Sequence, residues 1–159
     1  MRAIVIYYSF GGNTKRIARL ISDRLGADMA EIETVQEYTG SYNDIVNQGQ
    51  REVNKGFMPD IKPLSVDLSA YDTVILGSPV WWYTFAPAMK TFLSNADLSG
   101  KAVYAFATNG GWLGNTIEDF QNACAGADFR GGLDIRFDTK TLKTPEDKII
   151  KWVDEIKNK

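Results

Sequence analysis

The chain has 159 residues, 44% of them hydrophobic and 24% charged, with a formal net charge of −2. These values are ordinary for a globular protein and predict one domain over residues 1–159. The nearly neutral charge gives no electrostatic reason to expect nucleic acid or a membrane as a partner. Histidine is absent, which excludes the catalytic arrangements that depend on it.

The number of cysteines and the length of the apolar segments indicate the cellular compartment of the protein. The only cysteine, Cys124, cannot form an internal disulfide, so we expect a reducing cytoplasm and a small buried side chain on a helix. The apolar start of the chain is too short for a signal peptide, and no segment is long enough to cross a bilayer. We therefore expect a cytoplasmic protein. The absence of histidine indicates in addition that its chemistry comes from a bound cofactor.

The N-terminal half of the chain alternates strand and helix patterns. Residues 3–8 form an apolar run typical of a buried strand, and residues 13–25 carry apolar side chains at helical spacing. Residues 29–34 alternate apolar and polar side chains, which predicts a half-exposed strand. Residues 73–77 form a short apolar strand.

The segment between these last two strands, residues 35–71, is longer than one helix requires. Ser41 and Asp44 predict the start of a helix that continues to about Asn54. The glycine and prolines that follow predict irregular structure. The segment is either a surface excursion or part of the frame of a ligand site.

The C-terminal half continues the alternation. Pro87 suits the first position of a helix, and Asn115 with Glu118 matches the capping-box pattern at the start of another. The predicted elements here are strands at residues 102–107 and 133–137, and helices at residues 87–93, from 115 onward and from 144 onward.

Five predicted strands that alternate with helices indicate a three-layer α/β fold with a doubly wound parallel sheet. The first, third and fourth strands are apolar throughout and should be buried on both faces. The second and fifth alternate and should lie at the edges. The strand order 2-1-3-4-5 satisfies this pattern. A sheet of this order binds its ligand at the carboxyl ends of the strands, beside the switch between strands one and three.

A glycine-rich loop, Ser9-Phe10-Gly11-Gly12-Asn13-Thr14, follows the first strand. Its glycines allow backbone N–H groups to turn inward, its polar side chains add donors, and the helix start adds a partial positive charge. The loop matches neither the P-loop nor the dinucleotide-binding pattern. It is either an anion site or a plain strand–helix turn with Asn13 as the cap, and we expect Asn13 and Thr14 to lie outside the core.

Two further loops follow the third and fourth strands. In the second loop, around Trp81-Trp82-Tyr83, four aromatic side chains occupy five consecutive positions. A flat ligand stacked there explains this crowding, although the aromatic rings could instead cover the core or an oligomer contact. In the third loop, Gly110 and Gly111 permit close approach of backbone to a flat ligand, and Trp112 offers another platform. The alternative is an ordinary flexible connection.

On these loops the sequence resembles the flavodoxins, particularly compact members whose second loop reads Pro-x-Trp-Trp-Tyr. The resemblance covers nearly the whole chain and also rests on residues 98–101 and 106–111. It implies a flavodoxin-like fold and bound flavin mononucleotide (FMN). The cofactor-binding residues that it implies are Ser9, Gly11, Gly12, Asn13, Thr14, Pro79, Val80, Trp81, Trp82, Tyr83, Asn109, Gly110, Gly111, Trp112 and Gly114.

The resemblance also implies which loop binds each part of the cofactor. The FMN phosphate is expected on the first loop, and the isoalloxazine ring between the second and third loops. In the usual phosphate signature, T/S-x-T-G-x-T, a hydroxyl residue stands where this chain has Gly11. Lys15 either compensates for that lost donor or points to solvent. We therefore expect weaker phosphate binding.

We expect an electron-transfer flavoprotein, with an NAD(P)H-dependent reductase as the main alternative. A carrier would pass electrons between redox partner proteins, and the absence of histidine fits it. A reductase would take hydride from NAD(P)H and pass electrons to a quinone or another small molecule, and a net charge of −2 is small for a dedicated carrier. A phosphoacceptor receiver and a flavin-free structural protein are further alternatives. We expect a monomer or homodimer, without a metal site or a catalytic side chain.

Overall fold

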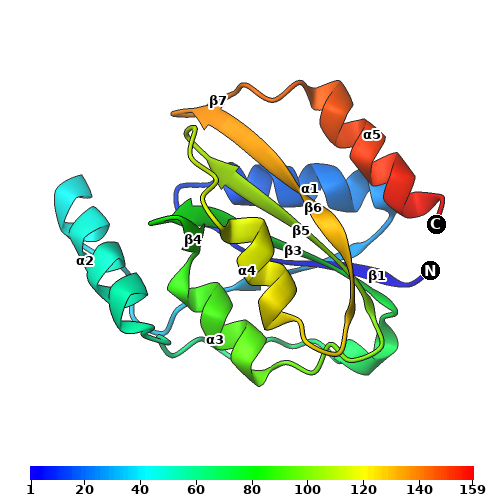
Figure 1. Cartoon of the computed structure of the whole chain (residues 1–159), viewed down its shortest axis with the longest axis horizontal. Helices are drawn as coiled ribbons and strands as arrows, with labels where there is room; N and C mark the ends of the chain where they lie inside the picture. The colour runs from blue at the N-terminus through cyan, green and yellow to red at the C-terminus, as the bar shows by residue number, and fades with distance from the viewer.

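A mainly parallel, twisted sheet forms the centre of the computed structural model, which describes residues 1–159 (Figure 1). The sheet order is β2-β1-β3-β5-β6-β7, with β4 paired to β3. The five parallel strands are β1 (Ala3–Tyr8), β2 (Asp28–Ile32), β3 (Thr73–Trp81), β5 (Ala102–Asn109) and β6 (Asp128–Asp138). In chain order these five follow 2-1-3-4-5, so the predicted fold class and strand order are confirmed.

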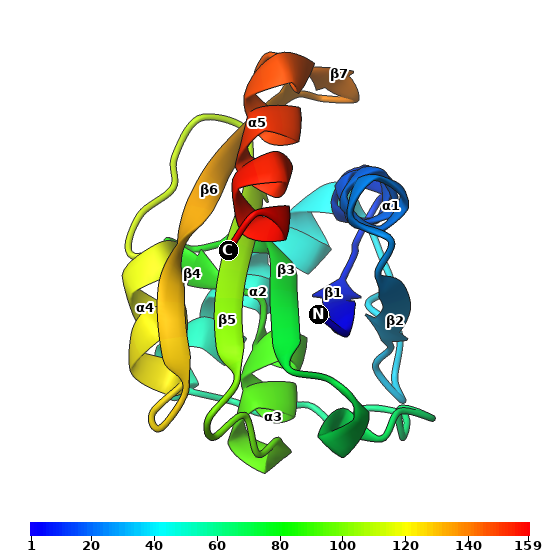
Figure 2. The same cartoon turned by 90° about the vertical axis from the view of Figure 1, so that its right-hand side faces the viewer.

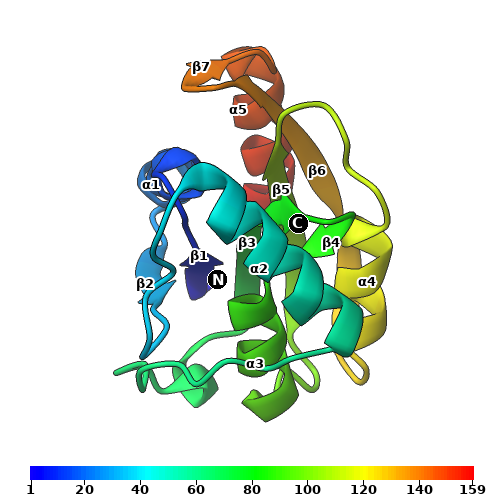
Figure 3. The same cartoon turned by 90° about the vertical axis from the view of Figure 1, so that its left-hand side faces the viewer.

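Helices cover both faces of the sheet. Figure 2 shows α1 (Asn13–Leu25) and α5 (Glu146–Lys157) next to each other on one face. Figure 3 shows the other side, where α3 (Pro87–Asn95) and α4 (Thr116–Ala123) lie near α2 (Tyr42–Lys55). Each face has its own core of buried side chains, 17 residues on the α3–α4 side and 16 on the α1–α5 side. The sheet is therefore buried from both sides, as its apolar strands require.

Burial along the strands follows the predicted alternation. All six residues of β1 are buried, whereas β2 at the sheet edge has only Ile32 buried. In β6, Leu133, Ile135 and Phe137 are buried and alternate with more exposed side chains. Each fully buried isoleucine or leucine contributes about 1.5–3 kcal/mol relative to an exposed one. This alternation therefore fixes which strands can lie at the edges.

The two predicted helix starts that rest on a serine or a proline are confirmed. The Ser41 hydroxyl accepts a hydrogen bond from the Asp44 N–H at 3.2 Å, and the Asp44 carboxylate accepts one from the Ser41 N–H at 3.0 Å. This capping box starts α2, which ends at Lys55. Pro87 occupies the first turn of α3, where its missing N–H costs no helical hydrogen bond.

The predicted capping box at Asn115 is wrong. Asn115 precedes α4, but its side chain makes no capping hydrogen bond. Its backbone N–H donates to the Tyr83 carbonyl at 2.8 Å, and its φ of −96° and ψ of 16° depart from the extended conformation of a capping residue. The contact with the second loop thus determines the backbone here, in place of the local sequence pattern.

Two short antiparallel strands are additions to the predicted sheet. Strand β4 (Thr84–Phe85) folds back on β3, and β7 (Thr141–Leu142) folds back on β6. Their partner strands are also longer than predicted, since β3 continues to Trp81 and β6 runs from Asp128 to Asp138. Two-residue strands are too short to produce a recognisable alternating pattern.

No helix of the structure has both the length and the apolar character that a membrane-spanning helix needs.

Cys124 is buried at the end of α4, as expected, and burial raises the pKa of its thiol to about 11. A thiol with this pKa stays protonated near neutral pH and is a poor nucleophile.

Candidate functional site

Three loops meet at the carboxyl ends of β1, β3 and β5. The first loop, residues 9–14, joins β1 to α1, and its backbone turns through Gly11 and Gly12 with φ values of 86° and 102°. Gly12 precedes the first helical residue of α1, so the N–H groups at the helix start belong to this loop. The Ser9 hydroxyl accepts a hydrogen bond from the Lys15 N–H at 3.1 Å. Such a backbone is suited to an anion.

The polar side chains of the first loop are already engaged with other parts of the chain. Asn13 does not cap the helix, because its amide nitrogen donates to the Thr139 carbonyl at 2.8 Å. Thr14 is only 1% exposed, and its hydroxyl is hydrogen-bonded to that of Thr108 at 2.8 Å. The expectation that Thr14 lies outside the core is therefore wrong. It faces inward from the first turn of α1.

Lys15, the candidate to replace the donor missing at Gly11, has a different partner. Its ammonium nitrogen lies 3.3 Å from a Glu31 carboxylate oxygen at the sheet edge, and its side chain is 49% exposed. The Tyr7 hydroxyl donates to the same carboxylate at 2.9 Å. Glu31 thus holds the lysine beside β2.

The structure separates the three consecutive aromatic residues of the second loop. The Trp81 ring packs edge-to-face against Tyr8, Phe10 and Tyr38, with ring centroids 5.0–5.9 Å apart. The Trp82 indole N–H donates to the Val46 carbonyl in α2 at 3.0 Å.

Tyr83 is 52% exposed, in contrast to its two neighbours. Trp82 and Tyr83 adopt φ values of 50° and 72°, in the left-handed region that residues with side chains rarely occupy. This turn directs the three rings to different surroundings.

Polar contacts hold helix α2 to Tyr38, whose ring packs against Trp81 of the second loop. The Tyr38 hydroxyl donates to Glu52 at 2.6 Å, and the Gln48 amide donates to the other Glu52 oxygen at 2.8 Å. Burial, and then Glu52, raise the pKa of Tyr38. The 35–71 segment therefore packs against the candidate site, and does not simply extend from the surface.

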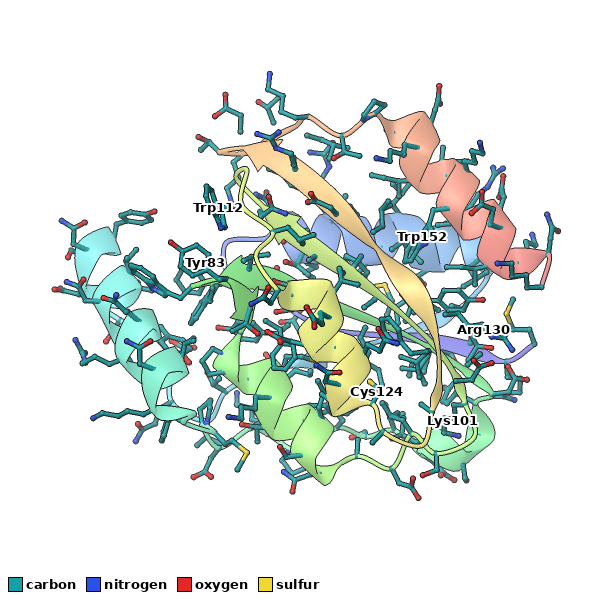
Figure 4. All side chains as sticks on the ribbon, in the orientation of Figure 1. Tyr83, Lys101, Trp112, Cys124, Arg130 and Trp152 are labelled. Carbon is teal, nitrogen blue, oxygen red and sulfur yellow. The ribbon has the colours of Figure 1, made fainter.

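A surface pocket of about 570 Å³ lies between the second and third loops. The rings of Tyr83 and Trp112 both line it and contact each other, with centroids 5.9 Å apart and planes inclined by 70°. Figure 4 shows both at the same end of the molecule, opposite Lys101 and Arg130. The pocket is lined by Val80, Trp82, Tyr83, Asn109, Gly110, Gly111, Trp112 and Arg136. Its size and its aromatic walls suit a flat ligand.

The third loop is held in place from β6 and from the second loop. The Asn109 amide donates to Asp134 at 2.6 Å, and its oxygen accepts from the Gly111 N–H at 2.9 Å. A Cβ on Gly114 would lie 2.5 Å from the Tyr83 carbonyl oxygen. Glycine at this position is therefore required for the contact between the two loops, and Gly114 itself does not line the pocket.

The structure brings together most of the predicted site residues and adds others. Predicted Trp81 turns toward the aromatic cluster around Tyr38, while Pro79 lies in β3 opposite Thr108. The additions come from the end of the chain, where Arg136 lines the pocket and Thr139 contacts the first loop. The alternating pattern of residues 133–137 indicates that Arg136 is exposed but gives no sign of what it faces.

No group of three or more histidine, cysteine, aspartate or glutamate side chains lies close enough to hold a metal ion. A second cavity of about 400 Å³ lies between α2, α3 and α4 and shares no lining residue with the pocket at Tyr83 and Trp112. The three loops are thus the place where the glycines, the donors and the flat aromatic surfaces coincide.

Curated relatives match parts of this chain. Flavodoxin 1 of Escherichia coli K12 is 28% identical over 106 residues, which are 64% of this chain and 46% of that protein. The uncharacterised NAD(P)H oxidoreductase YcaK of the same organism is 23% identical over 93 residues, which are 56% of this chain and 47% of that protein. The chain thus spans about half the length of the curated relatives that it matches.

Solved structures match over a larger share of the chain. A predicted flavoprotein from Bacteroides eggerthii DSM 20697 has a TM-score of 0.82 at 29% identity, covering 98% of this chain and 97% of its own. A flavoprotein from Lactobacillus acidophilus NCFM, crystallised in complex with FMN, has a TM-score of 0.75 at 22% identity, covering 84% and 92%. The sequence profile of the flavodoxin family matches residues 2–156. The chain therefore belongs to the flavodoxin family.

Proposed function

We propose that this protein binds FMN at the three loops and uses it to carry electrons between redox partner proteins. The observation that carries the proposal is the juxtaposition of a glycine-turned anion loop with a pocket walled by Tyr83 and Trp112, at the switch point of the sheet. Membership of the flavodoxin family and the likeness to a flavoprotein crystallised with FMN support it. When bound, FMN supplies an acceptor for one or two electrons.

The residues present suit each part of this cofactor. We assign the phosphate to Ser9, Gly11, Gly12, Asn13 and Thr14, whose N–H groups surround the start of α1. We assign the ring to the pocket between residues 79–83 and 109–114. Tyr83 and Trp112 are the candidates for stacking, because Trp81 and Trp82 have other partners. The bare backbone at Gly110 and Gly111 allows close approach to the ring edge.

A second candidate function is an NAD(P)H-dependent reductase of quinones or other small molecules. The similarity to an NAD(P)H oxidoreductase supports it, as does the exposure of the Tyr83 and Trp112 rings, which leaves room for a second planar molecule. The net charge of −2 also provides little long-range steering toward a basic protein partner. For either role we propose a single cytoplasmic domain that acts as a monomer or homodimer.

An anaerobic visible spectrum of the FMN-loaded protein, recorded before and after addition of NADPH or NADH, tests both candidates. A carrier keeps its flavin absorbance until a chemical reductant or a reductase partner is added. Rapid bleaching by NAD(P)H, well above the rate for free FMN at equal concentration, would replace the carrier with the reductase. A protein that retains no flavin absorbance after incubation with FMN and gel filtration would overturn both.

A further inference from the structure

The turn between β6 and β7 lies directly against the first loop. Three contacts hold it there: the Asn13 amide donates to the Thr139 carbonyl at 2.8 Å, the Arg16 guanidinium donates to the Lys140 carbonyl at 3.4 Å, and the Lys140 ammonium donates to the Gly11 carbonyl. Thr139 turns the chain with a φ of 54°. The tip of this hairpin therefore borders the loop assigned to the FMN phosphate.

The Asn13 and Thr14 side chains of the first loop have partners within the protein. The Thr14 hydroxyl is paired with Thr108, and the Asn13 amide with Thr139. The one lysine next to the loop in sequence, Lys15, is paired with Glu31. A phosphate dianion on this loop would thus find backbone N–H groups and the Ser9 hydroxyl, but no cation from the loop itself.

Lys140, from the turn between β6 and β7, places a cation beside this loop. It is exposed, and none of the three ion pairs in the structure includes it. Its ammonium nitrogen lies 3.3 Å from the position that a Cβ on Gly11 would occupy, so it sits beside the place where a side-chain donor at position 11 would begin. Arg16 is less suited, since its guanidinium lies over the Phe137 ring at 5.8 Å from the centroid.

We propose that Lys140 is a phosphate-binding residue, which makes the protein select FMN over the unphosphorylated flavin, riboflavin. The proposal rests on the proposed binding of FMN at this site. In the free protein the ammonium donates to the Gly11 carbonyl, and on binding it donates to phosphate oxygens at the edge of the same loop. Hydrogen bonds to charged groups are worth enough to change affinity by about tenfold or more.

The test compares dissociation constants for FMN and riboflavin, measured by flavin fluorescence at low and high salt. The variants are Lys140→Gln, Lys140→Arg and Lys151→Gln, a matched loss of charge on the exposed face of α5. For Lys140→Gln we expect FMN to bind about tenfold more weakly while riboflavin affinity changes by less than about twofold. We expect Lys140→Arg to retain most of the FMN affinity and Lys151→Gln to resemble the unmodified protein. The salt dependence for FMN should be weaker in Lys140→Gln.

The experiment distinguishes a failure of the proposed role of Lys140 from a failure of the proposed flavin binding. If Lys140→Gln leaves FMN affinity unchanged, or weakens FMN and riboflavin equally, the role of Lys140 is wrong while flavin binding stands. An equal loss in Lys151→Gln would reduce the effect to net charge and overturn the specific role. If the unmodified protein binds neither flavin, the proposed function fails, and the role of Lys140 fails with it. Thermal unfolding of each variant checks that the fold is retained.

Discussion

The hydroxyl oxygens of Thr14 and Thr108 lie 2.8 Å apart and share a hydrogen bond. Thr14 belongs to the first turn of α1, whereas Thr108 lies near the end of β5, and both side chains are buried. This bond connects the base of the first loop to the base of the third. A buried hydrogen bond therefore joins the first loop to the strand that leads into the third loop.

Replacing one of these threonines should leave the other hydroxyl buried without a partner. We expect Thr14→Val or Thr108→Val to lower the free energy of unfolding by about 1–3 kcal/mol each. The double variant should cost clearly less than the sum, because both polar groups are then absent. Urea unfolding of the four proteins gives this comparison. Strictly additive losses would show that the hydrogen bond contributes little.

The exposed rings of Tyr83 and Trp112 should matter for the flavin and not for the fold. We expect Tyr83→Ala and Trp112→Ala each to weaken binding of FMN and riboflavin alike, by about tenfold, since stacking on an aromatic ring is worth roughly 1–3 kcal/mol. Stability should change by less than about 0.5 kcal/mol. Tyr42→Ala removes another exposed tyrosine, on α2, and is the matched control. Equal flavin affinity in all three variants would remove the ring assignment.

Substitutions at two glycines of the third loop should have different effects, one on the stability of the fold and the other on flavin binding. Gly114 has a φ of 60°, and a Cβ there would collide with the Tyr83 backbone, so Gly114→Ala should destabilise the fold by about 1–3 kcal/mol. A Cβ on Gly110 meets nothing closer than 3.9 Å. We expect Gly110→Ala to keep its stability and to lose flavin affinity, because Gly110 lines the pocket assigned to the ring. Calorimetry and a fluorescence titration measure the two effects.

Alkaline pH should destabilise the protein partly through Cys124. Burial raises the pKa of its thiol from 9.0 to about 11, so its contribution is complete below pH 9 and disappears as the pH rises through 11. The stability advantage of the unmodified protein over Cys124→Ala should therefore shrink across that interval. The folded protein should also react slowly with a thiol reagent at pH 8 and quickly once unfolded. Fast labelling of the folded protein would contradict the burial.

The sheet order could be predicted because central strands are apolar throughout, whereas edge strands alternate apolar and polar residues. Residues 3–8 are apolar throughout, whereas the pattern at residues 133–137 skips every second position, and this difference identifies centre and edge. The capping box at Ser41 was predictable for a similar reason, since all its partners lie within three residues. Interactions of this kind join residues that are close in sequence, so a short sequence pattern is enough to predict them.

The detail of the site depends on contacts between distant segments. Trp81, Trp82 and Tyr83 are adjacent and chemically alike, and only the packing of α2 against two of them leaves the third free. Lys140 follows a strand pattern but has nothing in its own neighbourhood that points to Gly11, 129 residues earlier. Sequence patterns thus located the loops but not the direction of each side chain.

Helix α2 lies beside the layered body of the protein, as Figure 1 shows, with only Gly49 and Glu52 buried along its length. Regions with few buried apolar contacts open at a lower free energy than the core does. Its backbone amides should therefore exchange hydrogen with solvent while β1 and β5 remain protected. Each such opening would release Trp82 from Val46 and move Gly49 away from the ring of Trp81. Transient detachment of this one surface helix would thus give solvent intermittent access to Trp82, which lines the pocket.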